Sequence, residues 1–353
     1  MTNNRTNIEY YLGVNSETSK WNVRPLFQLH YGDMDFIDTS TDTATMGIRM
    51  SCDNCPVDLV ETWYAEQNSQ VTTGCFHDGK LHYVEAKDTI LIFGELGQLH
   101  DIENTTFNAF QATFETLRDK GYQYLLRSWN LIPSINGYNK DGIENYQAFC
   151  KSRALAFIDA GLQERQMPAA TGIGSHSRNI CGYLLATKRS DYIHLENALQ
   201  RPAYEYPRRY GPKSPSFARA TLFDGVASSA DTPTQFFLSG TASIRRSETM
   251  WQDDIVNQVQ TMMENVSYLV GTENARISGH SALIELVDFE HFKVYYRRNE
   301  DYQIIKDILV DTWHISAEKL IFMNVDICRS DLLVEVEGCI NRLRFAEKEM
   351  AAI

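Results

Sequence analysis

The chain has 353 residues, of which 43% are hydrophobic and 22% charged, so it can bury the core of a globular protein of about two domains. Its formal net charge of −13 argues against a nucleic-acid partner, because phosphate binding requires a basic surface. Arginine pairs at 208–209, 245–246 and 297–298 still permit a small anionic ligand.

Strands and one helix are predicted in the first third of the chain. Alternating apolar runs at 80–85 and 89–93 are typical of strands. Apolar residues spaced by three and four predict a helix over 104–120, and Gly121 suits the end of that helix. A further strand is expected over 122–132.

A second helix is predicted over 146–162. Its period places Tyr146, Cys150 and Arg153 on one side, within reach of one another. The segment 163–174 is rich in turn residues, and we expect a domain boundary nearby.

The second half of the chain predicts short strands separated by two helices. The expected strands are 217–223, 236–244, 292–296, 320–327 and 332–337, and the expected helices are 247–270 and one through 305–313. This order is typical of an α+β fold with helices packed on one face of mixed sheets. We predict an N-terminal α+β domain over residues 1–170 and a C-terminal domain over residues 171–353.

The stretch 326–338 contains the strongest candidate for a catalytic group. Its apolar and acidic residues alternate, so Val334 and Val336 point one way while Glu335 and Glu337 point the other. A carboxyl group that such a strand holds in a cleft has a raised pKa and can donate a proton at neutral pH. Glu335 is our candidate acid and Glu337 the second choice. The alternative is that both belong to a solvated strand face.

The loop 200–219 combines five arginine or lysine residues with three tyrosines and several prolines. Guanidinium groups bind carboxylates through paired hydrogen bonds, and tyrosines add hydroxyl donors and flat apolar walls. The loop therefore suits a cyclic dicarboxylate, although a solvated loop paired with surface acids would have the same composition. Small residues at 239–244, which include Gly240 and Ala242, would let a ligand approach the backbone closely or simply form a tight turn.

The cysteines and the ends of the chain indicate the cellular compartment. Seven scattered cysteines fit reduced thiols better than a disulfide framework. Cys52, Cys55, Cys75 and His77 could supply soft ligands to zinc, but their spacing is not that of a zinc knuckle, and we expect thiols and no metal. No apolar run reaches the ~18 residues of a membrane span, and residues 1–7 lack the core of a secretory signal, so we expect a cytoplasmic protein with no membrane partner.

Several long motifs, in one order along residues 120–345, resemble the chorismatase (chorismate hydrolase) family. They are 127–133, 146–157, 204–219, 237–244 with Glu248 after it, and above all 326–338. The resemblance implies a fold related to the YjgF/RidA superfamily in the C-terminal catalytic domain, with a divergent, related N-terminal half. It also implies removal of the enolpyruvyl group of chorismate as pyruvate, without metal or cofactor.

The family resemblance also assigns roles to single residues. It implies that Glu335, seven residues beyond Cys328, protonates the enolpyruvyl methylene carbon. Gly240 and Cys328 match the branch that makes 3-hydroxybenzoate, whereas another branch hydrolyses chorismate to a dihydroxycyclohexadienoate. A third group makes mixed 3- and 4-hydroxybenzoates, and these two residues do not separate it from the 3-hydroxybenzoate branch. The expected substrate contacts are Arg153, Tyr204, Arg209, Tyr210, Ala242 and Arg297.

Two other classes of function stay open from the sequence. One is a deaminase-like hydrolase of imines or enamines, which would not need the loop 200–219. The other is a small-ligand binder without catalytic activity. We expect a monomer or a small homo-oligomer whose partner is the small-molecule substrate.

Overall fold

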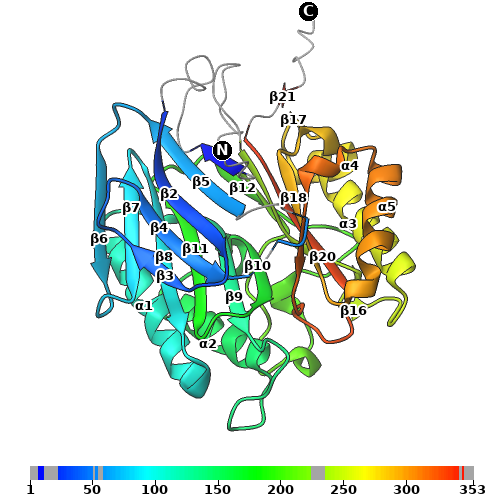
Figure 1. Ribbon diagram of the computed structural model, residues 1–353, viewed down its shortest axis with the longest axis horizontal. Coiled ribbons are helices and arrows are strands. Elements are labelled where there is room, and N and C mark those ends of the chain that lie inside the picture. The colour runs from blue at the N-terminus through cyan, green and yellow to red at the C-terminus, as the bar shows by residue number, and fades with distance from the viewer. Residues whose placement is uncertain are drawn as a thin grey trace, which may run out of the picture.

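The computed structural model describes residues 7–11, 23–50, 52–54, 59–223, 235–341 and 344–345. Within these residues, three large β-sheets surround a shared apolar core, and helices lie on the outside (Figure 1). Helices α1 and α2 lie together near the second sheet, and α3, α4 and α5 lie beside the third. The α+β fold expected from the sequence is confirmed.

The first sheet is mixed and is built from the N-terminal strands. In spatial order its strands are β1 (Asn7–Tyr11), β5 (Leu59–Glu66), β2 (Val23–Gly32), β4 (Ala44–Arg49) and β3 (Phe36–Asp38). Along β2 every second side chain, at Phe27, Leu29 and Tyr31, is buried in the shared core. This period of two is the one expected of a strand that packs one face on a core.

The second sheet contributes its inner face to the shared core and its outer face to two helices. In spatial order its strands are β10 (Ala169–Ser175), β9 (Tyr124–Pro133), β11 (Ile180–Thr187), β8 (Thr89–Gly97), β7 (Leu81–Ala86) and β6 (Val71–Phe76). Helices α1 (Ile102–Asp119) and α2 (Asn145–Asp159) bury Phe110, Phe149 and Phe157 against it. Gly121 follows α1 with φ +78°, as expected of a glycine at a helix end.

The third sheet carries the strand with the candidate acid. In spatial order its strands are β12 (Tyr192–Leu195), β13 (Ala220–Phe223), β14 (Gln235–Ala242), β20 (Val334–Ile340), β18 (His291–Tyr296) and β19 (Leu320–Asn324). Helices α3 (Ile255–Val270) and α5 (Tyr302–Trp313) cover its outer face, and α4 (Thr272–Ser278) follows α3. Two short strand pairs complete the structure: β15 (Ile244–Arg245) with β16 (Glu248–Thr249), and β17 (Ala282–Leu283) with β21 (Arg344–Phe345).

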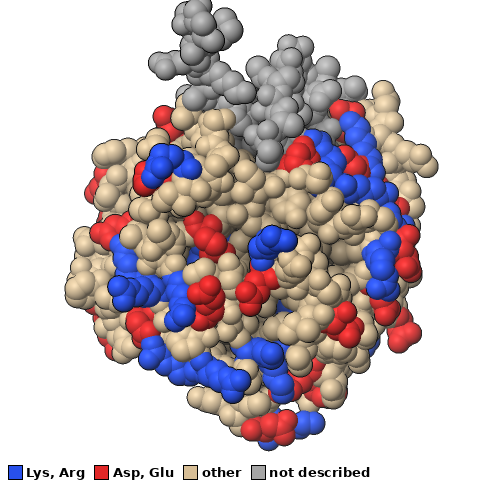
Figure 2. Space-filling model, turned by 180° about the vertical axis from the view of Figure 1, so that it is seen from behind, with Lys and Arg blue, Asp and Glu red and all other residues tan. Residues whose placement is uncertain are grey.

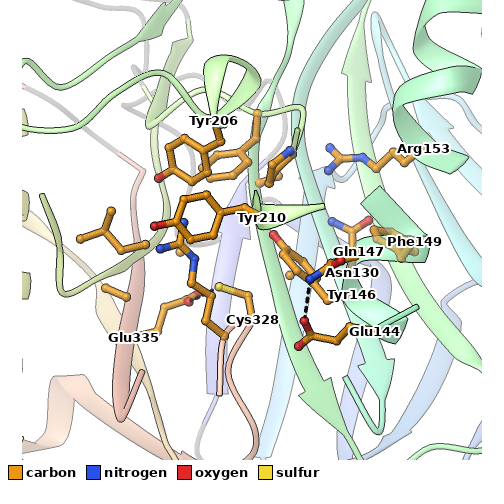
Figure 3. A pocket seen from close by; sticks show the side chains of 18 of the residues that line it. Asn130, Glu144, Tyr146, Gln147, Phe149, Arg153, Tyr206, Tyr210, Cys328 and Glu335 are labelled. Carbon is orange, nitrogen blue, oxygen red and sulfur yellow. Dashed lines mark hydrogen bonds between the residues drawn. The ribbon is translucent and has the colours of Figure 1, made fainter. Parts of the chain in front are cut away.

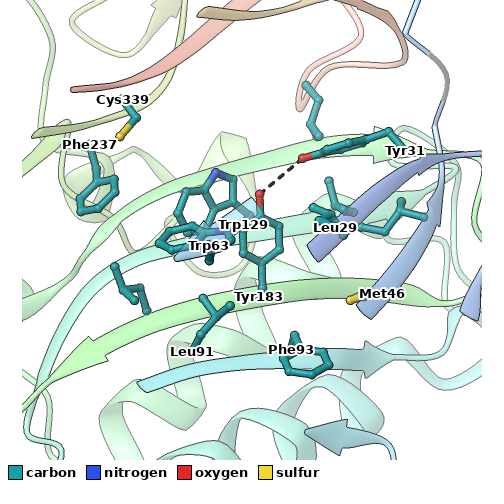
Figure 4. Close-up of a cluster of buried hydrophobic side chains, with 14 of the residues drawn as sticks. Leu29, Tyr31, Met46, Trp63, Leu91, Phe93, Trp129, Tyr183, Phe237 and Cys339 are labelled. Carbon is teal, nitrogen blue, oxygen red and sulfur yellow. Dashed lines mark hydrogen bonds between the residues drawn. The ribbon is translucent and has the colours of Figure 1, made fainter. Parts of the chain in front are cut away.

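The inner faces of all three sheets meet in one aromatic core (Figure 4). The rings of Trp129 and Tyr183 stack with centroids 4.4 Å apart, and Trp63 meets Trp129 edge-on at 5.7 Å. The hydroxyl groups of Tyr31 and Tyr183 lie 3.5 Å apart inside this core. Buried hydroxyl groups require polar partners, so the core must also contain polar or charged groups.

Two boundaries differ from the sequence expectations. The helix predicted over 247–270 begins only at Ile255, because Glu248–Thr249 forms a strand and Asp254 caps α3 by accepting the N–H of Asn257 at 3.1 Å. Residue 170 lies inside β10, in a sheet that continues to Thr187. The sheet order favours a division near 188–191, and the separation into two domains itself remains a prediction.

The surface mixes both signs of charge, as the face in Figure 2 shows. Across the described ranges, no helix combines the length and the apolar character that crossing a membrane would take. Cys52 takes part in a disulfide, contrary to the expectation of reduced thiols throughout, whereas Cys75, Cys150, Cys181, Cys328 and Cys339 are free. Cys55 lies outside the described residues.

Candidate active site

A cavity of about 210 Å³ lies between the second and third sheets. Its walls come from α2, β9, β10, β14, the loop 200–219 and residues 328–335. Six of the nine predicted site residues line it: Arg153, Tyr210, Gly240, Ala242, Cys328 and Glu335. In Figure 3, Glu335 and Cys328 lie at one side of this pocket, and Arg153 points in from the other.

Glu335 faces inward because β20 keeps its period of two in the middle of the third sheet. Val334 and Val336 pack under the outer helices, while Glu335 and Glu337 turn toward the centre of the molecule. The exposed fractions of the two glutamates are 3% and 2%, so the alternative of a solvated strand face is wrong. Ala242 on β14 lies opposite Glu335 in the sheet.

The surroundings of Glu335 favour its protonated form. Burial is the largest cause that raises the pKa of Glu335 to about 8, and the negative charge of Glu337 adds to it. The positive charges of Arg127 and Arg219 oppose this shift without cancelling it. Glu335 therefore holds a proton at neutral pH and can donate it inside a pocket.

Gly240 makes room for the Glu335 carboxyl group. A Cβ atom at position 240 would lie 2.0 Å from Oε1 of Glu335 and 3.3 Å from Oγ1 of Thr171. The strand is irregular here, because the register between β14 and β20 shifts between Leu238 and Thr241. Glycine thus lets the acid lie directly against the backbone of the neighbouring strand.

Cys328 is the polar side chain next to the acid. Its Sγ lies 3.9 Å from Oε2 of Glu335, and it is half-buried. Burial, followed by the nearby Glu335, raises the pKa of the Cys328 thiol well above its usual range. The sulfur is therefore a neutral thiol at neutral pH, which can donate a weak hydrogen bond and shape the pocket.

Glu337 differs from Glu335 although both lie on the same face of β20. It accepts hydrogen bonds from Arg127 at 2.7 Å and Trp129 at 3.1 Å, pairs with Lys293 at 3.2 Å and is bonded by Thr171. Burial alone would raise its pKa, but Lys293 and Arg127 outweigh burial, and the net pKa of Glu337 is lowered. An ionised carboxylate held by four donors is unsuited to donating a proton, so Glu337 is not the acid.

Arg153 supplies a buried positive charge with spare hydrogen-bonding capacity. It projects from α2, and its exposed fraction is 4%. Its Nε and Nη2 atoms have no hydrogen-bond partner among the described residues. Burial lowers the pKa of Arg153 to about 10, which still leaves it charged at neutral pH. A buried, charged donor without a partner is suited to an anionic ligand.

The opposite wall of the pocket contains Tyr206, Tyr210 and Arg329. The sequence analysis singled out Tyr210 as a substrate contact but not Arg329. The Arg329 guanidinium lies 3.9 Å from the ring centroid of Tyr210 and 5.2 Å from that of Tyr206. Its Nη1 donates to the carbonyl of Ser247 at 2.9 Å. Stacked and partly bonded in this way, Arg329 presents a fixed positive charge to the cavity. Its place directly after Cys328 is a signal that could have identified it.

Arg219 is a second cation that the sequence reading counted only as part of the loop. It lines the pocket with an exposed fraction of 2%, and its Nη2 donates to the hydroxyl of Tyr206 at 2.9 Å. Its Nε atom has no hydrogen-bond partner among the described residues, and Glu196 lies 4.0 Å away. Tyr206 and Arg219 therefore form one side of the pocket as a bonded pair.

Two predicted substrate contacts from the loop lie outside the pocket. Arg209 is exposed and forms an ion pair with Glu248, which also accepts the Tyr210 hydroxyl at 3.0 Å. Tyr204 lines a separate surface hollow that also contains Arg208. The short turns at Ala203–Glu205 and Arg208–Tyr210 point neighbouring side chains in different directions, so only part of the loop faces the cavity.

Arg297 also lies outside the pocket lining, and its bonds are internal. It donates to the carbonyls of Leu332 at 2.9 Å and Arg329 at 2.9 Å, and to Oδ1 of Asn136 at 3.0 Å. It also pairs with Asp326. Each of its three guanidinium nitrogens is bonded, mostly to the segment that carries Cys328 and Arg329, so the structure indicates a structural role in place of the expected direct carboxylate contact.

A metal centre finds no support in the part of the chain that the structure describes, because no three His, Cys, Asp or Glu side chains there could hold an ion together. Cys75 and His77 lie at the end of β6 and in the turn after it. Cys55, the fourth residue of that sequence pattern, lies outside the described residues.

Comparison with known proteins gives consistent matches. The family model for the N-terminal part of FkbO/Hyg5-like chorismatases matches residues 61–186. A 3-hydroxybenzoate synthase of Streptomyces hygroscopicus is 42% identical over 66% of this chain and 68% of its own length. A chorismatase of Streptomyces rapamycinicus is 34% identical over 80% of this chain and 82% of its own length.

A solved structure extends the similarity over nearly the whole chain. The crystal structure of a chorismatase superimposes with a TM-score of 0.82 and 28% identity, covering 94% of this chain and 96% of the other. The 94% coverage means that the similarity is not confined to one part of the chain. The chain belongs to the chorismatase family.

Proposed function

We propose that the protein is a chorismatase that converts chorismate to 3-hydroxybenzoate and pyruvate. The observation that carries the proposal is the pairing, in one pocket, of a carboxyl group that is protonated at neutral pH with a buried arginine that has free donors. Glu335 supplies the proton and Arg153 supplies a carboxylate site. The names of two relatives support the same activity, since one is a 3-hydroxybenzoate synthase and another a chorismatase.

The residues of the pocket match the chemistry of the substrate. Chorismate carries two carboxylates and a flat diene ring. Arg153, Arg219 and Arg329 offer three positive charges around the cavity, and Tyr206 and Tyr210 offer flat walls for the ring. Desolvated charged pairs of this kind contribute both affinity and orientation.

The reaction begins with proton transfer from Glu335 to the methylene carbon of the enolpyruvyl group. The C=C electron pair forms the new C–H bond, and the positive charge that develops is an oxocarbenium ion. Breaking the ether bond to the ring then releases the three-carbon unit as pyruvate. As the ether oxygen leaves ring carbon 3, the oxygen of the neighbouring hydroxyl on carbon 4 forms a bond to carbon 3 and releases its proton, which gives an epoxide. Opening of the epoxide bond at carbon 4, with return of a proton to the oxygen, leaves the hydroxyl on carbon 3, and loss of the C–H proton of carbon 3 makes the ring aromatic. The two products together contain the atoms of chorismate, so no net water is consumed.

Gly240 and Cys328 are proposed to favour the aromatic product. Gly240 holds the acid close to the strand backbone, and the thiol of Cys328 lies beside it. A pocket closed by side chains of this kind disfavours capture of the cation by bulk water. We also propose that the protein acts in the cytoplasm, which five free cysteines support, as a monomer or small homo-oligomer.

A single assay tests the proposal. The purified protein is mixed with chorismate, pyruvate is followed through lactate dehydrogenase, and the ring product is identified by chromatography. Equal amounts of pyruvate and 3-hydroxybenzoate are expected. Pyruvate with a dihydroxycyclohexadienoate would place the protein in the hydrolytic branch, and absence of pyruvate would leave imine hydrolysis or simple ligand binding as the alternatives.

A further inference from the structure

A cluster of four charged side chains lies behind the acid, in the core shared by the three sheets. Lys293 on β18 contacts Glu61 on β5 at 2.6 Å and Glu337 on β20 at 3.2 Å, and Glu337 contacts Arg127 on β9 at 2.7 Å. The exposed fractions of these four side chains are between 0% and 2%. The cluster contains two positive and two negative charges and links all three sheets.

The cluster satisfies both of its own carboxylates. Glu61 accepts hydrogen bonds from Tyr31 at 3.0 Å, Tyr183 at 3.2 Å and Trp63 at 2.9 Å, in addition to Lys293. Each cation is therefore engaged by an anion, and the sum of the charges is zero. Both cations therefore pair with carboxylates of the cluster, and Glu335 forms no ion pair with either of them, although the charge of Arg127 still lowers its pKa.

Glu335 lies two residues from Glu337 on the same face of β20 but has different neighbours. It forms no ion pair within the described part of the chain, and its neighbour at hydrogen-bonding range is the Cys328 thiol at 3.9 Å. The titratable and charged groups that face the two glutamates come from several elements of all three sheets, from α2 and from the loops. They are Tyr31 on β2, Glu61 on β5, Arg127 on β9, Tyr146 on α2, His291, Lys293 and Tyr295 on β18, and Arg219 and Cys328 from the loops.

We infer that Glu337 is a positioning residue whose fixed negative charge, locked in place by Arg127 and Lys293, keeps Glu335 in its proton-donating form. The inference rests on the proposed function and explains how one of two adjacent buried carboxyls becomes the acid. Two negative charges on neighbouring positions of one buried strand face repel each other, so the carboxyl without an ion pair keeps its proton. Once Glu335 has donated its proton, the same repulsion favours its taking up the proton that the ring releases.

Two variants should shift the pKa of Glu335 in opposite directions. Glu337→Gln removes the negative charge and leaves Arg127 and Lys293 in place, so Glu335 ionises more easily. The pH at which kcat falls on the alkaline side, near 8 in the wild type, should move to lower pH by about one unit or more. A shift of one unit lowers kcat about twofold at pH 7, about fivefold at pH 8 and about tenfold at pH 9, and the loss recovers at lower pH. Arg127→Met removes a cation that lowers the pKa of Glu335, so the same limb should move to higher pH.

The double variant Glu337→Gln, Arg127→Met separates charge from structure. It removes one anion and one cation, and its alkaline limb should lie between those of the single variants. If Glu337→Gln does not fold, comparing the double variant with Arg127→Met still measures the effect of Glu337. The alkaline limb of the double variant must then lie at lower pH than that of Arg127→Met. Thr171→Val is the matched control, because it removes a hydrogen bond to Glu337 without a change of charge and should leave the limb in place.

The result that would overturn the inference is an unchanged limb in Glu337→Gln, or a loss of kcat that is equal at every pH. A wild-type protein that does not turn over chorismate would instead refute the proposed function. In that case the carboxylic acid band of Glu335, identified as the infrared band lost in Glu335→Gln, still reports the protonation state. Loss of about half of that band or more at pH 7 in Glu337→Gln, where the wild type keeps most of it, would support the inference, and an equal band in both proteins would contradict it.

Discussion

Replacing Glu335 by glutamine should stabilise the protein while abolishing most of its activity. Glutamine has the shape of a protonated glutamate and remains neutral at every pH. In the wild type, the folded state must keep a proton on a buried carboxyl that is ionised in the unfolded chain at neutral pH. The substitution removes this requirement.

The size of the stabilisation follows from the pKa of Glu335, which is raised from 4.5 to about 8. A group whose folded pKa is raised gives its full stability below pH 4.5 and loses it progressively as the pH rises toward 8. At pH 7 the unfolded chain has released the proton and the folded protein has kept it, which costs about 3 kcal/mol at 1.36 kcal/mol per pH unit above 4.5. Glu335→Gln should therefore be more stable than the wild type by about 3 kcal/mol at pH 7, and about equally stable at pH 4.5.

The activity should fall by about 10²–10⁴-fold or more, the range for loss of a general acid. No neighbouring group can replace the proton donor. Glu337 is ionised, and the thiol of Cys328 has a pKa well above its usual range. Pyruvate release by the variant should therefore stay low across the whole pH range.

Urea unfolding at pH 5 and pH 7, together with the coupled pyruvate assay, measures both effects. Glu337→Gln is the control of opposite sign, because it leaves the buried Arg127 without its anion and Lys293 with only Glu61, and it should destabilise the protein by about 3–5 kcal/mol. If Glu335→Gln gains no stability at pH 7, or gains the same amount at pH 5, then Glu335 is not protonated through burial. Near-normal turnover would remove it as the acid.

Three further predictions concern the pocket wall and its support. Arg153→Met should weaken chorismate binding by about 2–5 kcal/mol, which would be measured as a raised KM. The variant should lose little thermal stability, because two donor atoms of Arg153 have no partner in the described residues. An unchanged KM would show that the substrate carboxylates bind elsewhere. Arg297→Ala should lower Tm and kcat by loosening the loop that carries Cys328, whereas Arg209→Ala should change neither KM nor Tm measurably, since its ion pair is exposed. Replacing both Gly240 and Cys328 by alanine should shift the product from 3-hydroxybenzoate toward the hydrolysed dihydroxycyclohexadienoate. A change of about 1.4 kcal/mol in the difference between the barriers to the two products alters the product ratio tenfold. Identical chromatograms of variant and wild type would show that these positions do not determine the product.

The acid was predictable because its environment depends on a local pattern. A period of two in β20 places Glu335 on the inner face wherever the outer face packs under helices, and the helical period of α2 likewise turns Arg153 to the same side as Tyr146. These features require only that each element pack one face on a core. The position of Gly240 beside the acid agrees with the expectation of close approach.

The roles of the other arginines could not be predicted from the neighbouring sequence, because a guanidinium group bonds to whichever acceptors the fold brings near. Arg127 meets Glu337 across 210 positions of the chain, and Arg297 meets loop carbonyls that become available only when the loop folds. Composition identifies the loop 200–219 as rich in cations, but two short turns decide which of them face the cavity. Arg209 and Arg219 are ten residues apart, and only Arg219 lines the pocket.

The central position of β20 also decides which parts of the pocket can open. β20 has a neighbour on each side, β14 and β18, and both of its faces are covered, so its amide hydrogens should exchange only when the whole protein unfolds. The loop 200–219 on the other side of the cavity is joined to the rest by fewer backbone bonds and by exposed ion pairs such as Arg209 with Glu248, so its amides should exchange much sooner. We therefore expect substrate to enter and product to leave through fluctuations of the loop, while the proton donor stays in a strand that does not take part in them.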